Sequence, residues 1–263
     1  MQLEDSAREG VRSRNKWLST SLGILRFSHS GRFKLAHDLA AARPKGRLLD
    51  YGCGDGAFLG LSKGLFETAT GIEVDPRWVA KNTERYASDP AFSFYHADEV
   101  AKLADGSFDT VFCMEVLEHC TPPVATRVIH ALRRLVADDG RVIISVPIEI
   151  GPSLMLKQAY RAYAALRHHS DYAHRERYRA DEMVKMVLAG SQTGITRPII
   201  KEPCPDGSTI DYHGHKGFNW RTLRERLCEH FDVLETRFSP LPVVQSLLNS
   251  QAWFICAPKL IAP

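Results

Sequence analysis

Hydrophobic residues along this chain occur in short runs, separated by longer stretches of mixed apolar and polar residues. The run Arg141–Val146 is almost continuously apolar, as in a central parallel strand that is covered on both faces. The stretch Phe218–His230 has the spacing of an amphipathic helix, with Leu223 and Leu227 on its inner side. Strands that alternate with helices in this way predict an α/β fold with a mainly parallel sheet.

The same pattern gives a set of expected elements. The predicted strands cover residues 48–51, 68–74, 92–96, 108–114, 141–146, 231–238 and 251–257. The predicted helices cover residues 31–42, 57–64, 76–86, 121–135, 154–166, 180–189 and 218–230.

The turn after the first predicted strand carries candidate chemistry. In Arg47–Phe58, RLLDYGCGDGAF, glycine stands at every second position from Gly52 to Gly56. Strand, glycine-rich turn and helix form the nucleotide site of doubly wound domains, because glycine lets the backbone approach a ligand closely. The spacing also fits a dinucleotide fingerprint, but Asp50 before the glycines and the additional Gly56 argue against it.

This stretch resembles motif I of the class I S-adenosylmethionine-dependent methyltransferases, in which an acid is followed by an apolar residue and G-x-G-x-G. A second stretch, Phe108–His119, reads FDTVFCMEVLEH and is similar to the small-molecule branch of that family, which includes the quinone-biosynthesis enzymes. The likeness covers residues 46–147 well and the rest loosely. It implies a Rossmann-like, doubly wound α/β sheet of seven strands in the order 3-2-1-4-5-7-6, with a final antiparallel pair.

Acidic residues stand where strands of such a sheet end. Glu73 closes the second predicted strand, about twenty residues beyond the glycines, where an acid accepts hydrogen bonds from the ribose of a nucleoside. Asp75 is instead expected to cap the helix that begins at Pro76. In the resembling family an acid after the third strand takes the adenine amino group, and Asp98 matches that position, with Glu99 beside it.

The resemblance therefore implies S-adenosylmethionine (S-adenosyl-L-methionine) as the cofactor. Cys53 lies in the glycine turn, where its side chain is expected to be only a small filler. The residues expected to line the cofactor site are Asp50, Gly52, Cys53, Gly54, Gly56, Glu73, Val74, Asp98, Glu99, Met114 and Glu115.

Two segments lie outside the strong resemblance. Residues 1–45 form a basic lead-in, expected to be helical, and residues 46–263 form the methyltransferase domain. Within that domain, residues 148–217 replace the usual short connection after the fifth strand, and we expect them to be a helical lid over the cofactor edge. The Arg, Lys and aromatic residues of both segments either solvate helices or form a cationic rim. Such a rim would suit an amphiphilic or anionic acceptor, including a lipid-linked one, and peripheral contact with a membrane surface.

Composition narrows the function classes. The 263 residues suit one α/β domain with an insertion, and a formal net charge of +3 is too small to indicate nucleic acid. Six scattered cysteines without a C-x-x-C pair suggest reduced thiols in a cytoplasmic protein. The N-terminus lacks the apolar core of a signal peptide, and no apolar run approaches the roughly 20 residues of a membrane span.

Histidines are the candidate catalytic groups. Methyl transfer from a sulfonium is an in-line displacement, so a base is needed only where the acceptor must lose a proton. His119 follows the fourth strand, and it is either that base or a residue that orients the loop or contacts the cofactor. His213 and His215 end the insertion and are further candidates. No carboxylate or cysteine has the partner spacing of a metal site, so no metal is expected.

We expect a methyltransferase that acts on a small-molecule acceptor, with transfer to oxygen slightly favoured. One alternative is a cofactor-binding module of the same fold without turnover, and another is a protein or nucleic-acid methyltransferase. The intact matches at Asp50, Gly52, Gly54, Glu73 and Asp98 favour the enzyme. After the fourth strand, the sequence lacks the N-P-P-Y-like tetrad of the amino-group DNA methyltransferases.

Overall fold

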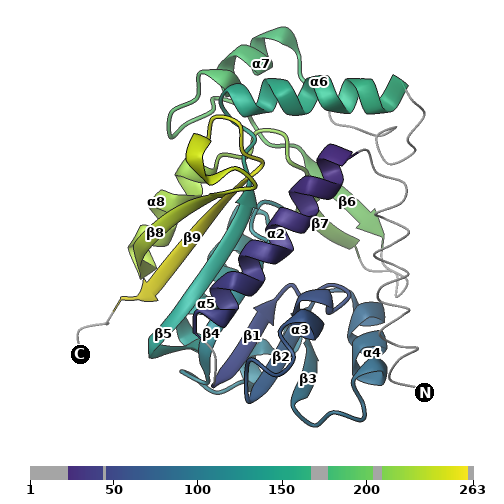
Figure 1. Cartoon of the computed structure of the whole chain (residues 1–263). Helices are drawn as coiled ribbons and strands as arrows, with labels where there is room; N and C mark the ends of the chain where they lie inside the picture. Colours follow the sequence, from purple (N-terminus) through teal and green to yellow (C-terminus); the bar gives the residue numbers. More distant parts are fainter. Residues whose placement is uncertain (1–22, 44–45, 167–176, 204–208, 260–263) are drawn as a thin grey trace.

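A seven-stranded sheet forms the centre of the protein (Figure 1). The computed structural model describes residues 23–43, 46–166, 177–203 and 209–259. The strand order is β3-β2-β1-β4-β5-β9-β8, with β3 to β5 parallel and β9 antiparallel to both of its neighbours. Because β8 and β9 are the sixth and seventh strands of this sheet along the chain, the predicted order and the final antiparallel pair are confirmed.

The elements agree closely with the expected ranges. The strands of the sheet are β1 (Arg47–Tyr51), β2 (Thr68–Glu73), β3 (Phe92–His96), β4 (Phe108–Met114), β5 (Val136–Pro147), β8 (Phe231–Ser239) and β9 (Gln251–Pro258). The helices are α2 (Gly23–Ala41), α3 (Ala57–Leu61), α4 (Pro76–Arg85), α5 (Pro122–Leu135), α6 (Pro152–Leu166), α7 (Ala180–Val187) and α8 (Trp220–His230), with 3-10 turns η1 (Ala97–Lys102) and η3 (Pro242–Val244).

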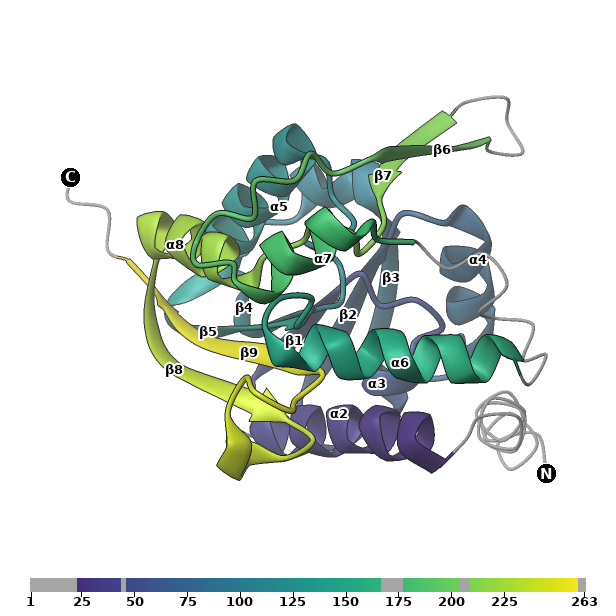
Figure 2. The same ribbon diagram turned by 90° about the horizontal axis from the view of Figure 1, so that it is seen from above.

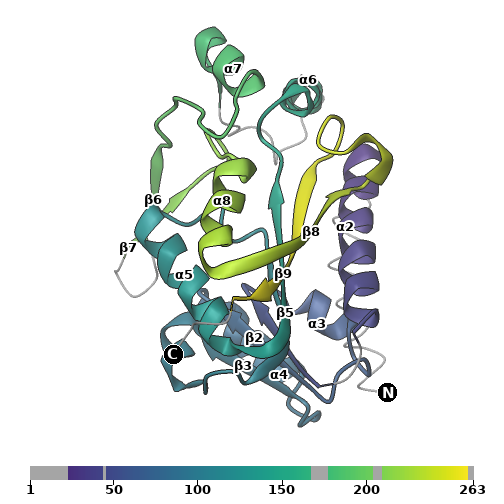
Figure 3. The ribbon, with the colours of Figure 1, turned by 90° about the vertical axis from the view of Figure 1, so that its left-hand side faces the viewer.

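Helices cover both faces of the sheet, and Figure 3 shows α2 and α3 on one side with α5 and α8 on the other. Leu48 and Leu49 are both fully buried, yet they belong to opposite apolar layers. Successive side chains of a strand point to opposite faces, so β1 contributes to both layers. Each layer is dense in large side chains; the rings of Phe58 and Phe112, for example, are 4.5 Å apart on the α2–α3 side.

Two predicted boundaries differ from the structure. Helix α2 begins at Gly23, well before residue 31. Strand β5 begins at Val136 because Val136 pairs with Phe108 before a register shift, although Asp139 and Gly140 suggested a loop there.

The insertion of residues 148–217 is not wholly helical, contrary to expectation. It contains α6 and α7 and also an antiparallel hairpin of β6 (Ile199–Pro203) and β7 (Thr209–His213). Most side chains of this hairpin are exposed, so it lacks the alternation of buried and exposed residues that reveals a strand in sequence.

The insertion lies at the carboxyl end of the parallel strands. Helix α6 follows β5 directly, and Figures 1 and 2 show α6 and α7 across the end of the sheet at which β1, β4 and β5 finish. This is the edge on which the lid was expected. Within the described part of the chain, no helix is long and apolar enough to cross a membrane. Residues 1–22 and the basic stretch from Arg167 to His174 lie outside the described residues.

Candidate functional site

The glycine turn between β1 and α3 has the backbone that only glycine adopts easily. Gly52, Gly54 and Gly56 have φ angles of 84°, 52° and 70°, all in the left-handed region. A Cβ atom at Gly52 would meet the side chain of Val116, whereas a Cβ at Gly54 would have no atom within 4 Å. The backbone at Gly54 is therefore open to the approach of a ligand.

Glu73, the last residue of β2, connects this turn to the end of its strand. Its Oε2 accepts a hydrogen bond from the backbone nitrogen of Gly54 at 2.8 Å. Its Oε1 accepts from the backbone nitrogens of Val74, at 2.8 Å, and Asp75, at 3.1 Å. A carboxylate has about four acceptor positions, so Glu73 retains capacity for a ligand hydroxyl.

Helix α4 supports the turn from behind. Asp75 caps this helix by accepting from the nitrogen of Arg77, with Pro76 at the first helical position, as predicted. Asn82 is fully buried and donates from Nδ2 to the carbonyl of Gly54 at 2.8 Å. The sequence analysis missed Asn82, because nothing in the sequence distinguishes this polar residue from the exposed ones of the same helix.

Asp50 lies under the glycine turn and is almost completely buried. Burial, and then the charges of Glu73 and Asp55, raise the pKa of its carboxyl to about 8. Its Oδ1 has no hydrogen-bond partner among the described residues. Cys53 is also buried, and burial raises the pKa of its thiol far above the ordinary range, which agrees with the expected role of a filler.

The loop after β3 forms the 3-10 turn η1. The side chain of Asp98 is 91% exposed on this turn, and its Oδ2 lies 3.3 Å from Nδ1 of His96. Glu99 is used locally: its Oε2 accepts from the backbone nitrogen of His96 at 3.0 Å and its Oε1 from Lys102 at 2.6 Å. Val74, half exposed, accepts on its carbonyl from Nε2 of His96 at 2.8 Å. Asp98 thus fits a ligand contact better than Glu99 does.

Strand β4 ends at Met114 and delivers Glu115 to the same edge. Glu115 has a φ of 58°, the left-handed conformation that side chains other than glycine rarely adopt. Its Oε1 accepts from the hydroxyl of Ser145 at 3.3 Å, and its Oε2 lies 3.7 Å from the guanidinium of Arg32 on α2.

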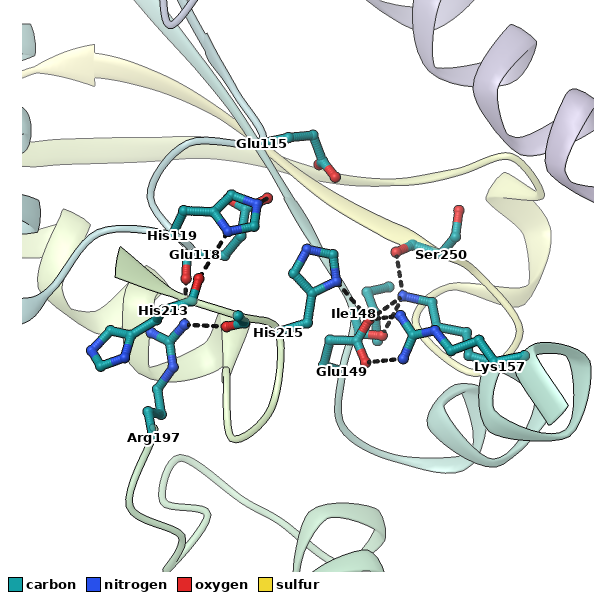
Figure 4. Close-up of polar contacts among 12 residues, drawn as sticks. Glu115, Glu118, His119, Ile148, Glu149, Lys157, Arg197, His213, His215 and Ser250 are labelled. Carbon is teal, nitrogen blue, oxygen red and sulfur yellow. Dashed lines mark hydrogen bonds and ion pairs between the residues drawn. The ribbon is translucent and has the colours of Figure 1, made fainter. Parts of the chain in front are cut away.

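His119 and its neighbour Glu118 follow on the same loop (Figure 4). Nδ1 of His119 lies 2.9 Å from the carbonyl of His213, so Nδ1 carries the proton and Nε2 has the free lone pair. Burial lowers the pKa of His119, although the bond to His213 opposes this. Glu118 is fully buried, and neither of its side-chain oxygens has a hydrogen bond among the described residues. Burial, followed by the charge of Glu115, raises its pKa well above the ordinary range.

Among the three histidines named from sequence, the structure brings together the rings of His119 and His215, 5.1 Å apart. The ring of His213 is turned away: it is buried, and its Nδ1 lies 2.8 Å from the carbonyl of Pro198 (Figure 4). Its backbone nitrogen and carbonyl instead hold the His119 loop. The expectation of His213 as a base stays a prediction, and the buried ring makes His119 and His215 the more accessible candidates.

A buried carboxylate that the sequence analysis missed lies beside His215. Glu149, just after β5, has no exposed side-chain surface, and its Oε1 lies 3.1 Å from Nζ of Lys157, 3.0 Å from Nη2 of Arg161 and 3.6 Å from Nδ1 of His215. The pattern Ile148–Glu149–Ile150, an acid between two apolar residues, was the available signal. Arg161, expected on a cationic rim, is instead turned inward to Glu149.

One group in this region has the composition of a metal site. Glu118, His119 and His215 each offer a ligand atom, and these atoms all lie within 4.8 Å of one another. Carboxylate and imidazole are ligands that divalent transition metals accept. The sequence-based expectation of no metal stays a prediction that only a metal analysis can test.

Comparison with known proteins finds a known family in the central part of the chain. Residues 49–144 match the family model described as "Methyltransferase domain". The ubiquinone biosynthesis O-methyltransferase of Xanthomonas oryzae pv. oryzae is 35% identical over 111 residues, which is 41% of this chain and 44% of the relative. That of Neisseria meningitidis is 30% identical over 135 residues, or 44% of this chain and 54% of the relative. The chain thus matches only about half the length of these curated relatives.

Solved structures match over most of the chain at low identity. The PH0226 protein of Pyrococcus horikoshii has a TM-score of 0.55 at 15% identity and covers 88% of this chain and 91% of its own. The N-methyltransferase NodS of Bradyrhizobium japonicum, in complex with S-adenosyl-l-homocysteine, has a TM-score of 0.52 at 13% identity and covers 87% of this chain and 86% of its own.

The fold and the glycine turn define the class: the chain carries a class I S-adenosylmethionine-dependent methyltransferase domain. The matched residues 49–144 end before the insertion begins.

Proposed function

We propose that this protein transfers a methyl group from S-adenosylmethionine to a hydroxyl group of a small molecule. The observation that carries the proposal is the bond from the Gly54 nitrogen to Glu73, beside open space above Gly54. It fixes a glycine turn and an acid with spare acceptor capacity at one sheet edge, as a nucleoside requires. S-adenosylmethionine supplies an activated methyl group when bound.

The roles follow the positions at the edge. Glu73 accepts from the ribose, Asp98 accepts from the adenine amino group, and the backbone of Gly52 and Gly54 leaves room for the rest of the cofactor. Met114 and Glu115, at the end of β4, face the transferred group. The insertion, whose helices α6 and α7 lie across the ends of the strands (Figures 1 and 2), is the lid that encloses the acceptor.

Transfer to oxygen has two supports. The curated relatives are named as O-methyltransferases, although they match less than half of this chain. In addition, imidazoles of His119 and His215 are present at the edge, and a hydroxyl acceptor needs such a base whereas a neutral amine does not. The Arg, Lys and aromatic residues in the sequence of the lead-in and the insertion support an amphiphilic or anionic acceptor, and peripheral contact with a membrane would follow from a lipid-linked one.

The test combines cofactor binding with turnover. Wild-type protein should bind S-adenosylmethionine in calorimetry and produce S-adenosylhomocysteine from extracted metabolites and lipids. Gly54→Val is the matched variant, because it fills the open space above the turn with a branched side chain and should abolish binding. Binding without S-adenosylhomocysteine on any extract would favour the alternative, a cofactor-binding module without turnover. Equal binding by Gly54→Val would remove the turn from the site.

A further inference from the structure

Glu149 is a buried carboxylate with two cationic side chains and a histidine around it. Its carboxylate receives Lys157 and Arg161 from α6 and faces His215 from the loop before α8 (Figure 4). Burial disfavours the charged form, but Lys157, His215 and Arg161 together outweigh it and hold the pKa of Glu149 well below its ordinary range. The group is therefore an anion at neutral pH.

This anion favours one tautomer of His215. Nδ1 lies 3.6 Å from Oε1 of Glu149, which is longer than a hydrogen bond, and an anion on this side of the ring favours hydrogen on Nδ1. Nε2 then has a free lone pair, and Figure 4 shows it on the side of the ring that points away from Glu149. Polar contacts of this kind are often long without substrate and shorten in the reacting complex.

His119 has the same tautomer but lacks this support. Its Nδ1 faces a neutral carbonyl, and its Nε2 lies 3.8 Å from Glu118, whose carboxyl oxygens have no hydrogen bond among the described residues. A histidine that takes up a proton becomes a cation, and an adjacent carboxylate stabilises that cation. Of the two imidazoles, His215 is the one whose Nδ1 faces a carboxylate that Lys157 and Arg161 bind.

We propose that His215 takes the proton of the acceptor hydroxyl and that Glu149 is a positioning residue that fixes its ring and tautomer. This inference rests on the proposed function. The acceptor oxygen bonds to the methyl carbon while the carbon–sulfur bond breaks and leaves its electron pair on sulfur. The acceptor O–H bond breaks, and its proton moves to Nε2 of His215, which becomes an imidazolium beside Glu149.

The same carboxylate connects this base to the lid. Lys157 and Arg161 bind Glu149 from α6, so the position of α6 and the orientation of His215 depend on one group. A lid that is displaced would also release the ring of His215.

The first test needs no acceptor. Nitrogen-15 NMR of the imidazoles should show His215 with hydrogen on Nδ1 in wild-type protein, and a mixture of tautomers in Glu149→Gln. Asp50→Asn, which changes a buried carboxyl under the glycine turn, is the matched control and should leave the His215 tautomer unchanged. Hydrogen on Nε2 in wild type, or the same tautomer in Glu149→Gln, overturns the proposal.

The second test uses acceptors of different acidity, namely phenol and 4-nitrophenol as probes together with any acceptor found by turnover. His215→Gln should lower kcat by about 10²–10⁴-fold with little change in S-adenosylmethionine affinity. The loss should be smaller for the more acidic hydroxyl, because it needs less help to ionise. A loss in KM alone, or turnover that a metal chelator abolishes, would make His215 a binding or metal-ligating residue and overturn the proposal. Failure of wild type on every acceptor would contradict the proposed function, while the NMR result would still stand or fall on its own.

Discussion

The Oε2 atom of Glu73 lies 2.8 Å from the backbone nitrogen of Gly54, across the gap between the ends of β1 and β2. The acid therefore holds the glycine turn, and we propose that it also accepts a hydrogen bond from the ribose of the cofactor. These two functions of one side chain can be separated by substitution.

Glu73→Ala should weaken binding of S-adenosylmethionine by about 1.5–3 kcal/mol, the range for hydrogen bonds to a charged group. Glu73→Gln should lose less, because its amide oxygen still accepts one bond. Calorimetry measures both, with Asp232→Asn on β8 as an exposed control that should bind like wild type. Unchanged affinity in Glu73→Ala would place the ribose elsewhere.

Two glycines of the structure have the same backbone conformation but different surroundings. Gly52 and Gly64 have φ angles of 84° and 83°, but a Cβ would meet Val116 only at Gly52. Gly64→Ala should cost about 1–2 kcal/mol from the left-handed backbone alone, and Gly52→Ala about 1–3 kcal/mol more from overpacking. Urea unfolding gives both values. Equal losses would mean that Val116 moves aside freely.

Substitution of Arg161 tests its pairing with Glu149 beneath the lid, and not a cationic rim around the site. Because it pairs with buried Glu149, Arg161→Glu would put two carboxylates together and should destabilise the protein on the order of 3 kcal/mol. Arg179→Glu removes an exposed pair with Asp181 and should cost less than about 1 kcal/mol. Thermal unfolding distinguishes them. Equal, small effects would show that Arg161 is surface charge, as the sequence suggested.

Asp50 predicts how stability changes with pH. Its pKa is raised from 3.8 to about 8 in the folded protein, so folding favours the protonated form. This contribution is complete below the unfolded pKa and is lost as pH rises through about 8. Between these values the folded state holds one more proton, and stability should fall by up to about 1.4 kcal/mol per pH unit. Asp50→Asn should flatten this part of a urea-unfolding pH series; parallel curves for wild type and variant would contradict the shift.

What the sequence predicted well is local. The glycine turn, Glu73 and the Asp75 cap follow from a few adjacent residues, and the strand order follows from a resemblance carried by two short motifs. The glycine turn and the Asp75 cap depend on backbone conformation within one turn, which residue types determine directly.

What the sequence missed depends on residues far apart in the chain. Glu149 meets His215 across sixty-six positions (215 minus 149), and Asn82 supports Gly54 from another helix. The hairpin β6–β7 has largely exposed side chains, so no burial pattern marks it. Such contacts depend on how distant segments of the chain pack together, and the composition of each segment does not show that packing.

The left-handed backbone of Glu115 has a cost for the whole fold. A residue with a Cβ atom loses roughly 1–2 kcal/mol in this conformation, and glycine would lose almost none. Glu115→Gly should therefore make the protein harder to unfold while it removes the carboxylate from the end of β4. At the end of β4, beside the proposed site, the chain keeps a residue that stabilises the folded state less than glycine would. This is the trade-off between robustness and activity that proteins commonly accept at working positions.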